Sequence, residues 1–147
     1  MKQKAAAFIL RWNASGKCEI LLHSFASDPS IPFRLPGGGV EAGESVEQAI
    51  FRELEEETGY SCWKLIRKLG VQNYFKPYIH SDVERHDFLF SAEVNLPAAW
   101  ESRVTGDGKD AGDIFNLYWT SVDSIEMVDE EHRPFINSNY IPEMLGN

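Results

Sequence analysis

The stretch GGGVEAGESVEQAIFRELEEETGY, residues 37–60, joins three glycines to a predicted helix that carries four glutamates in five positions. Ser45 can cap this helix, Gln48 completes a capping box, and Gly59 suits a left-handed C-terminal cap. So many like charges in one helix are costly unless they are solvated, paired with bases or neutralised by a ligand. The direction in which the carboxylates point therefore decides how the stretch is interpreted.

A helical wheel at about 100° per residue places three of the four glutamates toward the body of the protein. The apolar arc of the wheel contains Val46, Ala49, Ile50 and Leu54. Glu53, Glu56 and Glu57 fall inside this arc or at its edge, whereas Glu55 faces water. Arg52 is the only base nearby, so three inward carboxylates need a further counter-charge. Hard divalent cations such as Mg²⁺ prefer carboxylate oxygens, and the pattern predicts a metal site.

The glycines before the helix, residues 37–39, can bring the backbone close to a ligand. The helix start at Ser45 offers free amides and the positive end of a dipole to an anion. A glycine run alone is more often a plain turn. At fixed spacing from the glutamates, it favours a site for a phosphate.

The same residues resemble the signature of the Nudix hydrolases, G-x5-E-x7-R-E-U-x-E-E-x-G-U, in which U is a bulky apolar residue. The matching residues are Gly38, Glu44, Arg52, Glu53, Leu54, Glu56, Glu57, Gly59 and Tyr60. The resemblance implies an α/β fold, a Nudix-like α/β/α sandwich around a mixed β-sheet, formed by one domain over residues 1–147. It also implies an enzyme that cleaves a nucleoside diphosphate linked to another group, with Mg²⁺ or Mn²⁺ as cofactor.

Carried to this chain, the resemblance implies roles for particular residues. The carboxylates of Glu53, Glu56 and Glu57 and the backbone carbonyl of Gly37 would hold the metal ions, and Arg52 and Glu44 would orient them. Glu53 could instead act as the general base, which some family members take from a later loop; both alternatives stay open. The loop 101–113 offers acids for a further metal ligand, and Asp110 is favoured among them. The predicted substrate contacts are Arg34, Gly38 and Gly39.

Composition limits the partners. The chain has 147 residues, a formal net charge of -9 and 43% hydrophobic residues, which suits one ordered domain. The negative field disfavours nucleic-acid polymers and anionic membranes, so a small nucleotide is the expected substrate. No apolar run is long enough for a membrane span. Two cysteines without ligand spacing indicate a reducing, cytoplasmic location, and a monomer or homodimer is expected.

Turn chemistry divides the rest of the chain into elements. Strands are predicted over residues 5–12, 18–25, 63–75, 85–94 and 114–122. The first two flank NASGK and predict a hairpin. Residues 101–113 are interpreted as a polar loop, and short helices are expected over 121–127 and 132–145, although Pro134 and Pro142 limit the second.

Two other classes of function remain open. A Nudix-fold sensor could bind a nucleotide without cleaving it, and a scaffold domain could simply expose its acidic helix to water. The complete set of acids favours catalysis, because a pure binding module does not need all of them.

Overall fold

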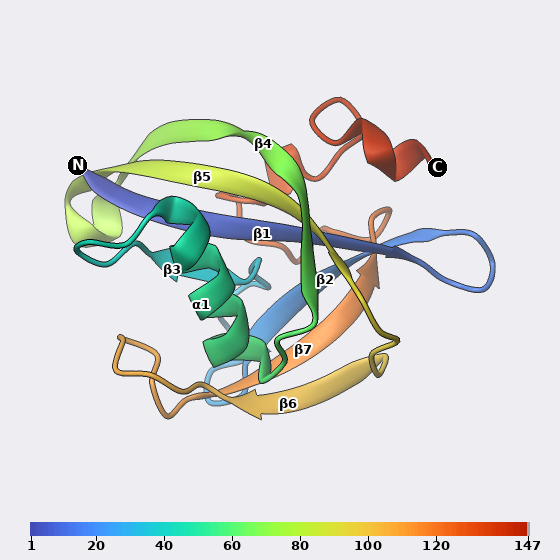
Figure 1. Cartoon of the computed structure of the whole chain (residues 1–147), viewed down its shortest axis with the longest axis horizontal. Coiled ribbons are helices and arrows are strands. Elements are labelled where there is room, and N and C mark those ends of the chain that lie inside the picture. Colours follow the sequence, from blue (N-terminus) through green and yellow to red (C-terminus); the bar gives the residue numbers. More distant parts are fainter. Residues whose placement is uncertain (147) are drawn as a thin grey trace.

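A computed structural model describes residues 1–146, and in that part of the chain seven strands form one mixed sheet (Figure 1). The strands are β1 (Lys2–Trp12), β2 (Cys18–Phe25), β3 (Gly37–Gly39), β4 (Trp63–Lys76), β5 (Ser81–Ala92), β6 (Ala99–Arg103) and β7 (Ile114–Ser121). Their order is β4-β5-β1-β2-β7-β6, with β3 paired to β1. β1 and β5 are parallel and the other pairs are antiparallel, so the predicted α/β class and mixed sheet are confirmed.

β1 and β2 form the predicted hairpin. Its turn is closed by the Asn13 amide, which donates to the Lys17 carbonyl at 2.9 Å, and by the Asn13 side chain, which accepts from the amides of Ser15 and Lys17. An asparagine that bonds the following backbone in this way stabilises a turn without help from distant residues. This explains why a local sequence pattern was sufficient to predict it.

Strand β1 separates two apolar cores because alternate side chains point to opposite faces of a sheet. Ala5, Ala7 and Ile9 pack on one face with residues of the helix α1 (Val46–Thr58). Phe8 and its neighbours at even positions pack on the other face, under the C-terminal segment. The sheet is thus covered on both sides.

Helix α1 has the predicted caps. The Gln48 amide donates to Ser45 Oγ at 3.1 Å, and the Ser45 amide donates to Gln48 Oε1 at 2.9 Å. Gly59 ends the helix with φ 78°, and its amide donates to the Glu55 carbonyl. Residues in this left-handed region are usually glycine. The helix lies across one face of the sheet beside β3, as Figure 1 shows.

The two helices predicted near the C-terminus are wrong. Ser121 ends β7, residues 122–127 form turns and irregular chain, and the segment 132–145 contains only the short 3₁₀ helices η2 (Arg133–Phe135) and η3 (Pro142–Leu145). A proline lies in the first turn of each 3₁₀ helix, where its fixed φ is tolerated. The same proline prevents a longer helix from continuing through its position. The layer opposite α1 is therefore built from turns and 3₁₀ helices.

Three further boundaries differ from the predictions. The residues 101–103, assigned to a polar loop, belong to β6 and pair with β7. The glycines 37–39, for which no strand was predicted, form β3. β5 begins at Ser81, after the 3₁₀ helix η1 (Pro77–Ile79). No helix in residues 1–146 has the length and apolarity that a membrane span requires.

Candidate functional site

The glycine strand β3 lies directly against the acidic side of α1. A Cβ added to Gly38 would lie 2.6 Å from Glu53 Oε1, so a larger residue here would displace that carboxylate. The Gly37 amide donates to Glu57 Oε1 at 3.0 Å. Pairing of β3 with β1 holds the strand in place. The predicted metal residues from the loop and from the helix are therefore neighbours in space.

Arg52 links the carboxylates of this site. Its guanidinium donates from Nε and Nη2 to the two oxygens of Glu44, at 2.7 and 3.0 Å, in a bidentate fork. Nη1 donates to Glu53 Oε1 at 3.1 Å and to Glu56 Oε1 at 3.2 Å, and Nη2 also donates to the Gly39 carbonyl. The hydrogen bond to Glu44 is the largest cause that raises the pKa of Arg52. A planar, permanently charged group fixes several acids at once.

The helix acids are in an environment that disfavours their charge. Glu57 is buried, with 3% of its surface exposed, and burial followed by the charge of Glu53 raises its pKa well above the ordinary value. Burial, again followed by the charge of Glu53, also raises the pKa of Glu56. The hydrogen bond from Arg52, by contrast, lowers the pKa of Glu44. Inward carboxylates are thus incompletely compensated by the protein, whereas the outward Glu55 is exposed.

The loop after β6 closes over the C-terminal half of α1. The Thr105 amide donates to the Glu56 carbonyl at 3.1 Å, and a Cβ added to Gly106 would lie 2.5 Å from Glu56 Oε2. Gly106 was not predicted as a site residue, although the glycines of this otherwise polar loop were a visible signal. Asp110 is half-buried and contributes to the raised pKa of Glu57. The structure thus brings Asp110 toward the helix acids, whereas Asp107 is exposed.

Among the predicted substrate contacts, Arg34 lies apart from the two glycines. Its guanidinium forms ion pairs with Asp129 at 2.7 Å and with Glu131 at 3.3 Å, both from the C-terminal segment. Gly38 and Gly39 are in β3, beside the helix acids. The predicted substrate residues therefore occupy two neighbouring parts of the molecule.

The residues present suit a divalent cation by their chemistry. Carboxylate oxygens are the preferred ligands of hard cations. The positive charge near these partly buried acids is insufficient to neutralise them. No preformed cluster of three His, Cys, Asp or Glu ligands exists in residues 1–146. Arg52 accounts for part of this, because it holds one oxygen each of Glu53 and Glu56.

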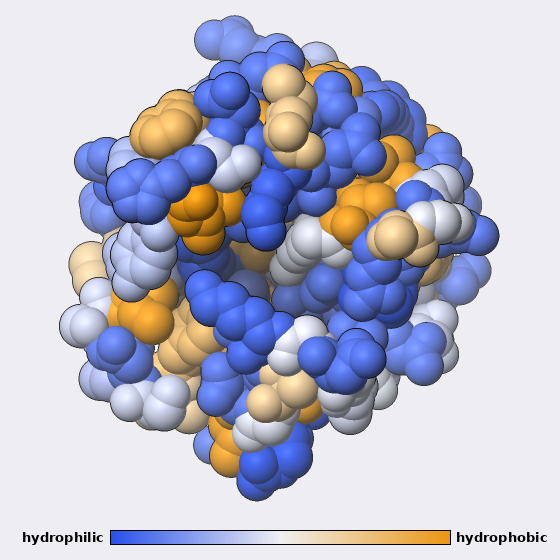
Figure 2. Space-filling view, turned by 90° about the vertical axis from the view of Figure 1, so that its left-hand side faces the viewer, coloured by the Kyte–Doolittle hydropathy of each residue, from blue (hydrophilic) through white to orange (hydrophobic). Residues whose placement is uncertain are grey.

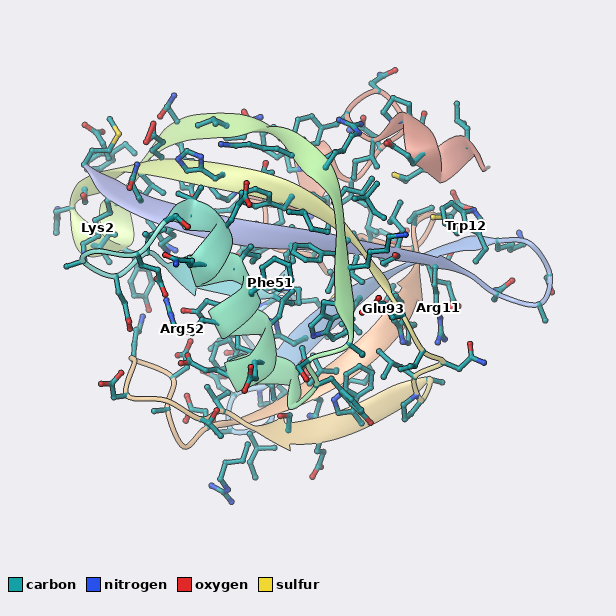
Figure 3. The ribbon with its side chains drawn as sticks, in the orientation of Figure 1. Lys2, Arg11, Trp12, Phe51, Arg52 and Glu93 are labelled. Carbon is teal, nitrogen blue, oxygen red and sulfur yellow. The ribbon has the colours of Figure 1, made fainter. Side chains whose placement is uncertain are left out.

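The site lies at one end of the molecule. Figure 3 shows Arg52 at the end that carries the N-terminus, whereas Arg11 and Trp12 lie at the opposite end. Figure 2 shows a hollow on the Arg52 end, surrounded mainly by hydrophilic residues. A polar hollow beside clustered acids can admit a charged ligand.

Comparisons with known proteins agree with this geometry. A family model described as the NUDIX domain matches residues 1–138. The chain is 67% identical over 85 residues to an ADP-ribose pyrophosphatase of Methanocaldococcus jannaschii, a match that covers 58% of this chain and 46% of that protein. It is 38% identical over 58 residues to an RNA pyrophosphohydrolase of Campylobacter jejuni, covering 40% of this chain and 36% of that one. The chain thus spans less than half the length of these curated relatives.

The fold has counterparts among solved structures. The crystal structure of a C. elegans Ap4A hydrolase binary complex superimposes with a TM-score of 0.71 and 20% identity, covering 99% of this chain and 98% of that one. This likeness concerns the fold. Together with the family match over nearly the whole sequence, it leads to one conclusion: the chain belongs to the Nudix family.

Proposed function

We propose that this protein hydrolyses a pyrophosphate bond in a small nucleotide or nucleoside diphosphate derivative, with a divalent cation. The observation that carries the proposal is the burial of Glu57 beside Glu53 and against the glycine strand, which leaves acidic charge that the protein does not neutralise. A scaffold or a solvated acidic helix would not require this inward arrangement.

The acids would hold the cation. Glu53, Glu56 and Glu57 supply carboxylate oxygens, the carbonyl of Gly37 adds a further oxygen, and Asp110 lies close enough to influence Glu57. Mg²⁺ or Mn²⁺, when bound, would supply polarisation of the phosphoryl oxygens and a lower pKa for an attacking water. An acidic protein can bind a pyrophosphate when ions between them provide the attraction.

Arg52 would position the ligands. In the structure it donates hydrogen bonds to Glu44, Glu53 and Glu56, so it helps to fix the rotamers of these three side chains. Holding groups in place in advance lowers the cost of organising them during the reaction. The Glu53 oxygen that Arg52 does not bind could also accept a proton from water, which keeps the role of Glu53 as general base open.

The test is a hydrolysis screen with and without Mg²⁺. The panel contains ATP, dGTP, ADP-ribose, a dinucleoside polyphosphate and a 5′-triphosphorylated RNA, which include the substrate classes named for the relatives. Product assays separate phosphate from pyrophosphate release. We expect activity that requires the divalent cation and favours a small nucleotide over the RNA.

Two variants of one helix sharpen the result. Glu57→Gln keeps the shape of the buried side chain but removes its charge, and we expect kcat to fall by orders of magnitude. Glu55→Gln removes an equal charge from the exposed side and should be nearly silent. Full activity in EDTA, or in Glu57→Gln, would exclude the metal mechanism. Metal-dependent nucleotide binding without turnover would indicate the sensor alternative.

A further inference from the structure

A second cavity lies at the end of the molecule opposite the helix acids. Figure 3 shows Arg11 and Trp12 at this end and Arg52 at the other. The cavity has a volume of about 500 Å³ and is lined by the end of β1, the turn that follows it, the end of β5 and the chain after β5. Sites for small molecules commonly measure about 300 to 1,000 Å³. The lining shares no residue with the candidate metal site, so a ligand here would be a separate one.

The divergence of two parallel strands opens this cavity. β1 and β5 pair as far as Ile9 and Phe90, after which the last residues of β5 pair with β4 alone. Residues 10–12 of β1 pair only with β2. In open α/β sheets, ligands commonly bind beyond the carboxyl ends of parallel strands. The cavity lies at this position for the parallel pair of the sheet.

Two hydrogen-bond donors at the cavity lack an acceptor. Trp119, which lines it, is 9% exposed, and its Nε1 has no partner among residues 1–146. Arg11 lies over the same ring, with Cζ 4.3 Å from the ring centroid. Its Nε donates to Glu19 at 2.8 Å and its Nη1 to the Leu96 carbonyl at 3.3 Å, whereas Nη2 makes no hydrogen bond to the described chain. Because buried N–H groups are nearly always paired, the free indole donor indicates a ligand that carries acceptors.

The cavity also has apolar walls. Trp12 is 39% exposed and Val94 is 55% exposed, and both line the cavity together with Leu10 and Leu96. Large apolar side chains that gather on an exposed surface often mark a binding site. Aromatic rings and a guanidinium group offer flat faces for stacking. A planar and partly apolar ligand therefore suits these walls.

The charge of Arg11 is already compensated by its ion pair with Glu19. Among the described residues, no second cation of the cavity lining stands beside it. An anionic ligand would compete with Glu19 for the guanidinium group. An uncharged acceptor can bond Nη2 and leave the ion pair intact, so the expected ligand is neutral.

We propose that this cavity binds an uncharged planar heteroaromatic molecule with two neighbouring hydrogen-bond acceptors, the chemistry of a 6-oxopurine nucleoside. O6 and N7 of such a base are adjacent acceptors, and arginine recognises this pair in nucleic acids. A 6-aminopurine has an amino donor in place of O6, so donor would face donor. The binding needs neither a cation nor the helix acids, so it goes beyond the proposed hydrolysis and does not depend on it.

The first test compares two nucleosides by calorimetry, in EDTA. Inosine carries a carbonyl at position 6 of the purine and adenosine an amino group, and we expect inosine to bind at least about tenfold more tightly. Arg11→Met should weaken inosine binding roughly 10- to 100-fold and remove the preference. Arg11→Lys keeps the charge but loses the planar fork, so it should lose the preference too. Lys17→Met removes an exposed cation of the same hairpin outside the cavity and should bind as the wild type does.

The second test observes the indole of Trp119 in the wild type by ¹H–¹⁵N NMR. Inosine should move its Nε1–H resonance downfield, because the proton gains an acceptor. Trp63 and Trp100 are internal controls, since their indole N–H groups already donate to backbone carbonyls. Equal affinity for inosine and adenosine, or undiminished affinity in a folded Arg11→Met, would overturn the ligand class. An unmoved Trp119 resonance at millimolar inosine would overturn the site, and this result needs no variant. Failure of the hydrolysis screen would leave both measurements unaffected.

Discussion

Glu57 offers a sharp test of the metal site through stability. It is 3% exposed, and its surroundings favour the neutral form, so a cation that binds its carboxylate should stabilise the native state specifically. A ligand at about 100 times its dissociation constant adds roughly 2.7 kcal/mol when it binds only the folded protein. At about 2 to 4 °C per kcal/mol for a domain of this size, Mg²⁺ should raise Tm by about 5 to 11 °C.

Glu57→Gln should change both the Tm of the metal-free protein and its response to Mg²⁺. The amide oxygen can still accept the hydrogen bond from the Gly37 amide, but the buried charge is absent, so the metal-free variant should melt at a higher temperature than the wild type. It should respond little to Mg²⁺. Calorimetric melting curves at matched ionic strength, with NaCl as the screening control and Glu55→Gln as the matched variant, provide the measurement. An equal Mg²⁺ shift in wild type and Glu57→Gln would refute the reasoning.

Three other predictions concern neighbouring groups. Gly38→Ala should lower kcat at least about tenfold by displacing the Glu53 carboxylate, whereas Gly108→Ala, whose Cβ would enter open space, is the control. Arg52→Lys loses the bidentate fork and should lower kcat with a small change in Tm; unchanged kinetics would contradict its positioning role. Burial, then the charge of Arg34, lowers the pKa of His23 to about 3, so its contribution to stability is present above pH 6.5 and decreases as pH falls toward 3. His23→Phe should therefore lose about 2.3 kcal/mol less stability than wild type between pH 6.5 and 4.5, measured by urea unfolding; parallel pH profiles would contradict this.

The helix and its acidic face could be predicted because the relevant contacts are local. Ser45 and Gln48 cap one end of α1 through bonds that span three residues, and Gly59 closes the other end. The direction of each glutamate follows from the helical repeat alone. The buried Glu57 and exposed Glu55 accordingly match the wheel.

The covering layer on the other face could not be predicted in the same way. Its backbone is held by distant partners: the Phe33 amide donates to the Met127 carbonyl, and the Asp129 amide donates to the Phe33 carbonyl. Apolar residues there pack against the sheet without forming an α-helix. The local pattern predicted that these backbone groups would form hydrogen bonds within a helix. In the structure they are satisfied by tertiary contacts instead.

The sequence by itself determined the family signature, the helix and the set of inward carboxylates, since these depend on spacing within one segment. Tertiary structure alone decided which other groups meet that helix. Gly106 approaches Glu56 because the loop after β6 folds back over α1, and Gly38 meets Glu53 because the pairing of β3 with β1 holds the glycine strand beside the helix. Residues far apart in the chain acquire shared electrostatics only when strand pairing and loop closure bring them together, so the surroundings of the helix acids are a property of the fold.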